Sequence, residues 1–393
     1  MRLNIIANWM QGTALSGGDR IFIELSKRWA SKINIRFFVS REGWEICRRE
    51  GLKGFNHKIW ASDKFNKCGY FINYLYRTFI SIVKSSRAKT GKDDIIYSSS
   101  DFWPDSIPAF IIKLGNPEAR WIAGFYLFAA LPWKKDSPYK KRFLTGLFYW
   151  LTQLPIYWLV QRYADMVFVT NELDVDRFIT RKRGKDKIVV IRGGVDIRPS
   201  EEYLNSGKIV PLGKRRYDAC FVGRFHYQKG VLELVDIWKS VCDRKPEAKL
   251  AMIGVGPLEN EVRKKIAKLG QDNIELLGFK DGEEKYEFFK QSKIIVHPAT
   301  YDSGGMAAAE GMAWGLPGVS FDLEALKTYY PKGMVKVQQG NQEEFSMQII
   351  KLLEDKKYYE KISEEAINLI VEEWDWNKRA NEIMEKLKIC TMI

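Results

Sequence analysis

The sequence contains few of the residues that build zinc sites and disulfide frameworks. Among its 393 residues there are five cysteines and three histidines, and no two cysteines form a Cys-x-x-Cys pair. An odd, scattered set of cysteines is typical of a reducing compartment, and it supports neither a disulfide scaffold nor a zinc site. We therefore predict a cytoplasmic protein that binds no metal.

The N-terminal segment lacks the long apolar stretch of a secretory signal peptide. The apolar run within residues 3–7 is too short for one, and it fits a first β-strand better. We therefore predict a first β-strand here and not a signal peptide.

Acidic residues are scarce in the first half of the chain. Residues 1–200 hold 34 Lys and Arg against 18 Asp and Glu, whereas the remaining residues hold 29 against 31. Such an asymmetry predicts an anionic partner for the first half, which is a membrane surface, a nucleic acid or an anionic substrate. Because no nucleic-acid-binding motif accompanies the charge, we do not expect a nucleic acid partner.

Apolar strand patterns alternate along the chain with amphipathic helical patterns, which is typical of parallel sheets covered by helices. A polar stretch, residues 199–216, is predicted to link two doubly wound, Rossmann-like α/β domains, residues 1–198 and 217–374. The predicted strands are Leu3–Ala7, Ile35–Val39, Asp94–Ser98, Arg120–Tyr126, Met166–Thr170, Lys187–Arg192, Ala219–Val222, Lys249–Gly254, Ile274–Leu277, Ile294–His297 and Gly318–Phe321.

One uncharged segment, Phe143–Val160, lies between two of the predicted strands and has basic residues on both sides, at 140–142 and 162. Its length is near the lower limit for crossing a bilayer, but Gln153 and Pro155 disfavour a span. Three interpretations stay open: a buried core helix, a helix at the membrane interface, or a membrane span.

The strongest chemical signal is the segment Tyr301–Pro317, which follows an apolar run typical of a buried strand. Gly304 and Gly305 open an alanine-rich helix, so the backbone can approach a phosphate, and free N–H groups and the helix dipole favour the anion. Asp302 precedes the glycines, and Glu310 follows it by eight positions, where its carboxylate can receive two neighbouring ribose hydroxyls. Close packing is the alternative explanation of the two glycines.

Two further segments carry charges or glycines at strand ends. Arg224 directly follows the strand that ends near Gly223, and Lys229 comes five residues later, so both cations are expected at the ligand-binding edge of a sheet. Two cations facing a glycine-opened helix suit a diphosphate. In the first half, Gly17 and Gly18 allow a close backbone approach before a helix, although a plain tight turn explains them equally.

In their order and spacing, these segments resemble retaining nucleotide-sugar glycosyltransferases of GT-B architecture, in the family 4 group (glycosyl transferases group 1). The resemblance implies two Rossmann-like domains that face each other across a cleft, with a C-terminal helix, 375–393, that returns to the first domain. The matching segments are Gly17-Gly18, Gly193-Gly194-Val195-Asp196, Val222-Gly223-Arg224, Lys229-Gly230, Ile253-Gly254, Gly256-Pro257, Leu277-Gly278-Phe279, His297-Pro298, Glu310-Gly311-Met312-Ala313, Gly315-Leu316-Pro317 and Trp374-Asp375-Trp376.

The resemblance implies a role for each matching residue. Arg224 and Lys229 would bind the donor diphosphate and stabilise it as it leaves, and Glu310 would bind the ribose. Asp302 takes the place of the first acid in the family's Glu-x7-Glu pattern, which contacts the donor sugar. Further contacts with the donor are implied for Gly17, Gly18, Gly254, Phe279, Gly304, Gly305 and Met306.

This chain departs from the family pattern at two points. The first acid is Asp302 and not Glu, so its carboxylate reaches about one methylene less far, which leaves the identity of the donor sugar open. Many members carry a histidine at the end of a first-domain strand, facing the sugar. Residues 121–128 contain none, and Tyr126 is the candidate to face the sugar or acceptor there.

The implied activity is transfer of a hexose from a UDP- or GDP-sugar, with retained anomeric configuration, to a hydroxyl of a glycan or lipid-linked acceptor. We expect no cofactor and no metal beyond the nucleotide sugar as co-substrate. The basic first half adds a peripheral location on the inner face of an anionic membrane. Two alternatives stay open: a non-catalytic membrane-surface-binding protein with a degenerate glycosyltransferase fold, and a sugar-nucleotide epimerase of the same architecture.

Overall fold

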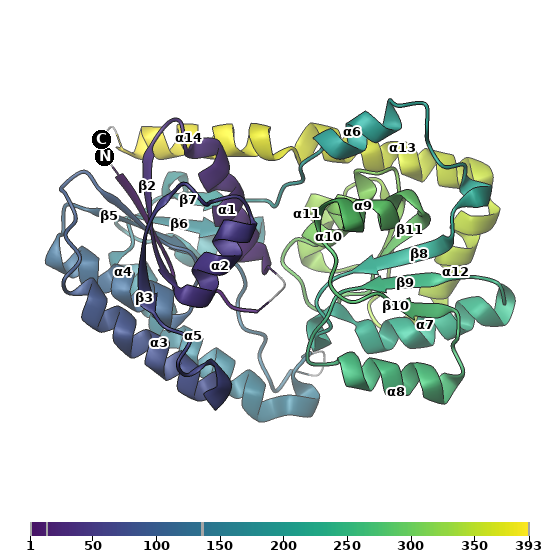
Figure 1. The fold of residues 1–393 in the computed structure, drawn as a ribbon, viewed down its shortest axis with the longest axis horizontal. Coiled ribbons are helices and arrows are strands. Elements are labelled where there is room, and N and C mark those ends of the chain that lie inside the picture. The colour runs from purple at the N-terminus through teal and green to yellow at the C-terminus, as the bar shows by residue number, and fades with distance from the viewer. Residues whose placement is uncertain (1, 13–14, 135–136, 392–393) are drawn as a thin grey trace. The chain divides into compact units, whose positions relative to one another are not determined.

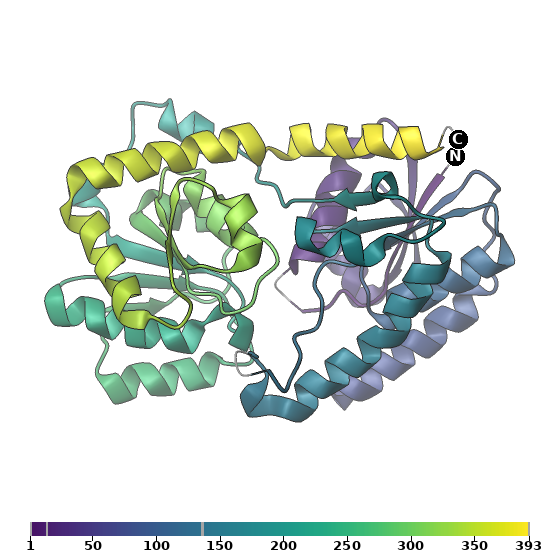
Figure 2. The ribbon, with the colours of Figure 1, turned by 180° about the vertical axis from the view of Figure 1, so that it is seen from behind.

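The structure is a computed structural model that describes residues 2–12, 15–134 and 137–391. The chain divides into two compact units: unit 1 is Met1–Arg192 with Trp376–Ile393, and unit 2 is Gly193–Asp375. Each unit is a parallel β-sheet with helices on both faces (Figures 1 and 2). This arrangement is the doubly wound α/β class that the alternating sequence pattern predicts.

Unit 1 is built on a seven-stranded sheet in the order β3-β2-β1-β4-β5-β6-β7. The strand order reverses between β1 and β4, which pair in parallel from Leu3 opposite Ile95 to Ile6 opposite Ser98. These strands are apolar and buried because helices cover both faces of the sheet. The strands are β1 (Arg2–Ala7), β2 (Asn34–Ser40), β3 (Asn56–Ala61), β4 (Ile95–Ser98), β5 (Arg120–Gly124), β6 (Met166–Val169) and β7 (Ile188–Val190).

The helices of unit 1 are divided between the two faces of this sheet. Helices α3 (Tyr70–Ser85), α4 (Trp103–Gly115) and α5 (Phe143–Tyr163) lie on one face (Figure 2). Helices α1 (Gly17–Trp29) and α2 (Arg41–Arg49) lie on the other. They run antiparallel to the strands between which they lie, so the C-terminal ends of α3, α4 and α5 gather at the N-terminal edge of the sheet.

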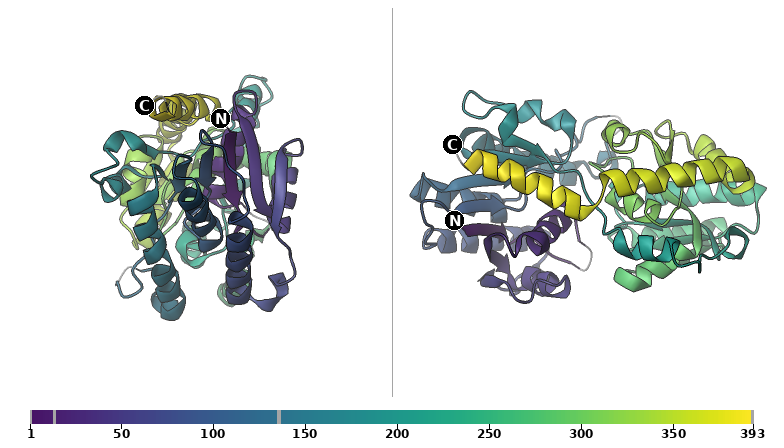
Figure 3. Two further views of the ribbon diagram at one scale, coloured as in Figure 1. Left: turned by 90° about the vertical axis from the view of Figure 1, so that its left-hand side faces the viewer. Right: turned by 90° about the horizontal axis from the view of Figure 1, so that it is seen from above.

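The last helix of the chain, α14 (Trp376–Thr391), packs on α1 within unit 1 (Figure 3). The Arg28 Nε donates to Oδ1 of Asn377 at 2.8 Å, and the indole N–H of Trp29 donates to the carbonyl of Ala380 at 2.9 Å. Side chains of the first helix thus hold the last helix in place.

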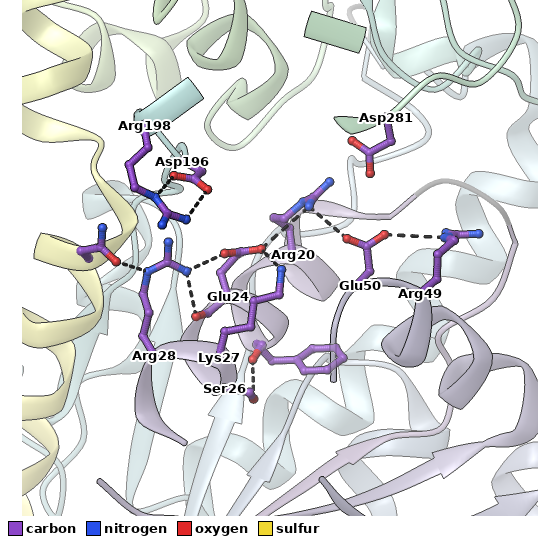
Figure 4. A network of polar contacts seen from close by, with 12 residues as sticks. Arg20, Glu24, Ser26, Lys27, Arg28, Arg49, Glu50, Asp196, Arg198 and Asp281 are labelled. Carbon is purple, nitrogen blue, oxygen red and sulfur yellow. Dashed lines mark hydrogen bonds and ion pairs between the residues drawn. The ribbon is translucent and has the colours of Figure 1, made fainter. Parts of the chain in front are cut away.

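Glu24 of α1 lies among three basic side chains (Figure 4). Its carboxylate is 2.7 Å from Lys27 Nζ, 2.6 Å from Arg28 and 3.9 Å from Arg20. Burial alone would raise the pKa of Glu24, but Lys27 and Arg28 hold that pKa below its ordinary value. Glu24 therefore stays ionised and orients Arg28 toward α14.

Unit 2 is built on a six-stranded sheet in the order β10-β9-β8-β11-β12-β13. The order reverses between β8 and β11, which pair in parallel with Ile294 opposite Ala219. The strands are β8 (Tyr217–Val222), β9 (Leu250–Ile253), β10 (Ile274–Leu276), β11 (Ser292–His297), β12 (Gly318–Phe321) and β13 (Met334–Val337).

Two apolar cores flank the sheet of unit 2. One contains side chains of α7 (Val231–Arg244), α8 (Glu259–Leu269) and α12 (Gln342–Glu354), such as Trp238 and Phe345. The other contains side chains of four further helices, such as Phe289 and Leu326. These helices are α9 (Gly282–Lys290), α10 (Met306–Met312), α11 (Glu324–Tyr329) and α13 (Lys356–Glu373).

The stretch predicted as a linker, residues 199–216, is part of unit 2, and the unit boundary lies between Arg192 and Gly193, not after residue 198. The stretch contains most of a short helix, α6 (Arg198–Leu204), in which only Ser200 is buried. A short, exposed helix has the polar composition of a linker, which explains the difference. The first and last segments of unit 2, which connect it to unit 1, lie side by side. Val195 near the start of unit 2 forms a parallel bridge with Asp375 at its end.

Helix α5, which contains the uncharged segment, is buried along one edge only. Gly146, Gln153, Ile156 and Val160 are its buried residues, and Gln153 Nε2 donates to Oδ2 of Asp101 at 2.7 Å. By length and composition alone the helix could cross a membrane, a test that a core helix of a soluble protein also passes. The structure corrects the interpretation as a buried core helix: α5 is anchored on unit 1 and exposes its opposite face.

Candidate functional site

The loops that follow β8 and β11 meet at the point where the strand order of unit 2 reverses. Ligands of open α/β sheets bind outside the carboxyl ends of the strands at such a switch point. The first loop runs from Gly223 to Gly230, and the second runs from Pro298 to Gly305. The predicted residues Arg224, Lys229 and Asp302 all lie in these two loops.

The structure brings Lys229 and Asp302 into direct contact, 73 residues apart in the chain. Lys229 Nζ lies 2.5 Å from Asp302 Oδ2, and Nε2 of His297 lies 3.0 Å from the same oxygen. The Asp302 side chain is 8% exposed and that of Lys229 is 29% exposed, so the carboxylate is buried while the ammonium reaches the surface.

Asp302 is ionised at neutral pH. Burial alone would raise the pKa of Asp302, but Lys229 and His297 together hold that pKa well below its ordinary value. A carboxylate paired with an ammonium and an imidazole is a fixed negative charge in the site. Lys229, which has three N–H donors, keeps donors for a second anion.

Asp302 also determines the shape of the glycine turn before α10. Its Oδ1 accepts from the backbone N–H groups of Ser303 at 2.7 Å and of Gly304 and Gly305 at 3.3 Å each. The hydroxyl of Tyr330 lies 3.0 and 2.8 Å from the carbonyl oxygens of the two glycines. We expected both glycine N–H groups to face a phosphate, and here they face Asp302, because a short carboxylate readily binds the backbone just after it.

The remaining predicted contact of this segment, Met306, is the first residue of α10. Its side chain packs where a Cβ on Gly193 would lie, 2.2 Å from the Met306 Cγ. Gly193 and Met306 therefore pack together inside unit 2, which explains a glycine at position 193.

Gly230 lets the two loops approach closely. Its φ is +63°, and a Cβ at this position would lie 1.9 Å from the carbonyl oxygen of Pro298. Beside it, the carbonyl of Gln228 accepts from the backbone N–H of Thr300 at 2.9 Å. Both features fix the distance between Lys229 and Asp302.

Replacing Gly230 by Ala is expected to lower the free energy of unfolding by about 3 kcal/mol or more, because the methyl group meets a backbone carbonyl and the left-handed conformation adds strain. Urea unfolding measures the difference. Gly270→Ala is the matched control, since Gly270 has a φ of +60° and no heavy atom within 4 Å of a Cβ. Equal losses in both variants would contradict the close approach.

Arg224 is exposed at the end of β8. Within the described ranges, no carboxylate lies within ion-pair distance of its guanidinium, in contrast to the pairing of Lys229. A guanidinium without a protein partner at a switch point is available to an anionic ligand.

Glu310, in the second turn of α10, lies in a separate charged pair. Its Oε2 is 2.9 Å from Nζ of Lys285, a buried lysine of α9 that also lies 2.9 Å from Oδ1 of Asp281. The Glu310 side chain is about one quarter exposed, so Lys285 orients the carboxylate while leaving part of it accessible. Neither Lys285 nor His297 was among the site residues predicted from the sequence.

Gly254 and Phe279 lie on neighbouring loops of unit 2. Gly254 has a φ of +145°, and a Cβ there would lie 1.9 Å from the carbonyl oxygen of Gly223. Its N–H donates to the carbonyl of Gly278, which precedes Phe279, at 2.8 Å. Close backbone packing thus accounts for Gly254, and it places the Phe279 loop beside the loop that carries Arg224.

The predicted residues of unit 1 form a cluster of their own. Gly17 and Gly18 open α1 behind a capping box made by Ser16 and Asp19. A Cβ on Gly18 would lie 2.7 Å from the ring of Tyr126. The Tyr126 hydroxyl is buried and hydrogen-bonded to that of Tyr97. A contact between Tyr126 and a sugar therefore stays a prediction.

The sequence contains one Asp-x-Asp pair, Asp174 and Asp176, although we expected no metal site. Asp174 lies 3.6 Å from Arg177, and the described part of the chain contains no group of three or more His, Cys, Asp or Glu side chains that could hold a metal ion. Metal independence stays a prediction.

Comparison with known sequences assigns the region that holds these loops. Residues 206–369 match the family model of glycosyl transferases group 1. The chain is 27% identical over 214 residues to an uncharacterized glycosyltransferase of Methanocaldococcus jannaschii, covering 52% of this chain and 55% of that protein. It is 28% identical over 160 residues to a GDP-mannose:cellobiosyl-diphosphopolyprenol alpha-mannosyltransferase of Xanthomonas campestris, covering 40% of each. The chain thus matches about half the length of these curated relatives.

Comparison with solved structures extends the likeness to the whole fold. HepE of Anabaena, solved with UDP and glucose, superposes with a TM-score of 0.71 at 15% identity over 99% of both chains. This likeness shows the fold alone, and it confirms the predicted GT-B class of two Rossmann-like units. Residues 206–369, which hold the two loops at the switch point, are thus similar to the glycosyl transferases group 1 family.

Proposed function

We propose that this protein is a retaining hexosyltransferase that uses a UDP- or GDP-sugar and glycosylates a hydroxyl of a glycan or lipid-linked acceptor at a membrane surface. The observation that carries the proposal is the pairing of Lys229 with buried Asp302 beside the unpaired Arg224, at the switch point of a unit that matches the family. Two cations next to one fixed carboxylate suit a ligand with a diphosphate and a sugar.

The proposed chemistry is charge stabilisation at the leaving group. As the bond from the sugar to the diphosphate breaks, negative charge grows on the phosphate oxygens, and Arg224 and Lys229 stabilise it where it develops. Asp302 orients Lys229 and lies where the resemblance expects the donor sugar. Glu310, oriented by Lys285, binds the ribose hydroxyls. The acceptor hydroxyl approaches on the face that the phosphate leaves, and a phosphate oxygen takes its proton.

Two proteins with related features support the donor and acceptor classes. The Xanthomonas campestris relative is named for a GDP-mannose donor and a diphosphopolyprenol-linked acceptor, and the HepE structure contains UDP and glucose. Both donors are nucleoside-diphosphate hexoses, and a polyprenol-linked acceptor resides in a membrane. The basic first half of this chain suits the same location.

The test is thermal unfolding of the protein with UDP, GDP, ADP, NAD and their common sugar conjugates. A ligand at 100 times its dissociation constant adds about 2.7 kcal/mol of stability, which is a readily measured shift. We expect a selective shift with UDP or GDP and their sugars. The matching sugar series then enters a transfer assay, whose products distinguish transfer from epimerisation.

The second candidate is a membrane-surface-binding protein without catalysis. It is favoured by the engagement of both glycine N–H groups by Asp302 and by the buried hydroxyl of Tyr126. Cooperative unfolding without a shift by any nucleotide would overturn the transferase proposal in favour of this candidate.

A further inference from the structure

Helix α3 of unit 1 has polar residues on its inner face and apolar residues on its outer face. Its buried side includes the polar residues Asn73, Arg77 and Ser81, which face the interior. Its outward side carries Phe71, Ile72, Leu75 and Phe79, and Phe79 is 66% exposed. Surface helices of soluble proteins normally show the opposite pattern, with charged residues outward. An apolar outer stripe on a helix with a polar inner face indicates a partner surface that is itself apolar.

Helix α5 carries a second outward stripe. Leu144, Leu151, Leu154 and Trp158 are exposed at helical spacing, with Leu144 78% and Trp158 58% exposed. The stripes are neighbours, because the ring of Phe71 lies 5.2 Å from that of Phe148. Both helices lie on the same face of the sheet in unit 1 (Figure 2).

The charges on these helices have one sign. Neither the 16 residues of α3 nor the 21 residues of α5 include Asp or Glu. Lys140 and Arg142 precede α5, Arg162 lies in its last turn, and Lys84 lies in the last turn of α3. Basic residues at both ends of an apolar helix are typical of a helix that lies flat at a membrane interface.

A basic pocket adjoins the C-terminal end of the α5 stripe. It has a volume of about 430 Å³ and lies at the N-terminal edge of the sheet of unit 1, near the end of α4. Arg162 lines the pocket and lies one turn after Trp158, so pocket and stripe are continuous. The charged lining residues are Lys113, Arg120, Arg162, Asp165, Lys182, Arg183 and Lys187.

Most of the positive charge in this pocket is uncompensated. Lys113 pairs with Asp165 at 2.8 Å, and Arg183 donates to backbone carbonyls. In the part of the chain that the structure describes, no carboxylate pairs with the other four basic residues, which are Arg120, Arg162, Lys182 and Lys187. Four unpaired cations around one pocket favour a bound anion. In a bilayer, the phosphate of a lipid head group is the anion that lies next to the acyl chains.

We propose that unit 1 binds a bilayer containing anionic phospholipid, with the outer stripes of α3 and α5 inserted at the interface and a lipid phosphate in the pocket at the end of α5. This inference names the surface through which the proposed transferase would contact the membrane. The membrane binding itself does not depend on the proposed function, but its biological role does. A second copy of the chain is the competing occupant. Two like-charged basic faces repel each other, which favours the anionic bilayer.

The test is co-sedimentation of the full chain with vesicles of phosphatidylcholine alone or with about 30% phosphatidylglycerol. We expect binding to the anionic vesicles that weakens with salt. The pocket variant, Lys182→Gln with Lys187→Gln, should weaken this binding about 30-fold. The stripe variant, Phe79→Gln with Trp158→Gln, should weaken it at least about tenfold. All four side chains are at least partly exposed, so both variants are expected to fold.

Matched controls lie in unit 2. Lys356→Gln with Lys357→Gln removes two exposed charges from α13, and Met347→Gln removes an exposed apolar side chain from α12. We expect both to bind vesicles like the unchanged protein. If the controls lose as much binding as the pocket and stripe variants, net charge and general hydrophobicity explain the binding and the assigned face is wrong.

Three other outcomes would overturn the inference. Equal binding to both vesicle types, with inorganic phosphate stabilising the free protein through the pocket residues, would assign the pocket to a soluble anion. A dimer in light scattering without lipid, lost in the stripe variant, would assign the stripes to a second copy. Absence of vesicle binding, with nucleotide shifts intact, would remove the membrane inference and leave the transferase proposal standing.

Discussion

Replacing Arg224 by Ala is expected to lower kcat/KM for the cognate nucleotide sugar by about 100- to 1,000-fold, with the thermal midpoint unchanged. The guanidinium is exposed and has no carboxylate within ion-pair distance in the described structure, so its removal costs the fold little. The loss falls on the transition state, in which the diphosphate gains negative charge. Steady-state kinetics with calorimetry on the same samples measure both quantities.

Lys229→Ala is expected to lower turnover by a similar factor and also to destabilise the protein, because it leaves the buried Asp302 without its ammonium partner. Arg263→Ala is the control, since Arg263 is an exposed arginine of α8 in an i,i+4 pair with Glu259. Unchanged rates in both site variants would refute the assignment of the two cations to the diphosphate.

Replacing Asp302 by Asn is expected to lower the free energy of unfolding at neutral pH by about 2–3 kcal/mol. The amide cannot compensate the charge of Lys229, although it still accepts hydrogen bonds from the backbone. The loss is below that of a fully buried pair because Lys229 reaches solvent. Urea unfolding of both proteins at several pH values measures the difference.

The pH dependence follows from the depressed pKa of Asp302. In the folded protein this pKa lies below its ordinary value of 3.8, so the carboxylate stabilises the fold fully at neutral pH, and this contribution is lost as the pH falls through the folded value. The two proteins should therefore converge in stability in acid. Asp243→Asn, in an exposed pair with Lys239, should change stability little at any pH. No difference at neutral pH would contradict the ionised, paired Asp302.

Buried parallel strands were the most predictable part of the fold. A strand that is covered on both faces has a continuous apolar run in its sequence. The predicted strands at β8, β9, β11 and β12 each contain such a run. The edge strands β3 and β13 were not predicted. Four of the six residues of β3 are exposed, and two of the four residues of β13 are only half-buried, so neither has the apolar run of a central strand.

Site residues were predictable from the sequence where a charged side chain directly follows a strand. Their contacts with residues from distant parts of the chain were not predictable. Lys229 and Asp302 were identified from their strands, but their direct contact depends on the packing of two loops 73 residues apart. His297 was visible as a histidine at a strand end. Lys285 gave no signal, because an amphipathic helix carries many lysines and only packing shows which one is buried.

The outer stripe of α3 was missed for a different reason. Periodicity shows that a helix has two faces, but it does not tell which face is turned inward. Sequence reasoning assigns the apolar face to the core by default. In α3 the buried Arg77, which donates to backbone carbonyls of Asn8 and Met10, makes the polar face the inner one.

The packing of α14 on α1 has a consequence for biosynthesis. Unit 2 is inserted into unit 1, since residues 193–375 separate the main part of unit 1 from its last helix. A ribosome makes about 5–20 residues per second, so the surface of α1 that α14 covers stays uncovered for on the order of 10–40 s after the rest of unit 1 has been synthesised. Unit 2 has all of its strands before unit 1 is complete. In the nascent chain, the inserted unit 2 can therefore fold before unit 1 is complete. Until α14 is made, the uncovered surface of α1 is where a chaperone would be needed.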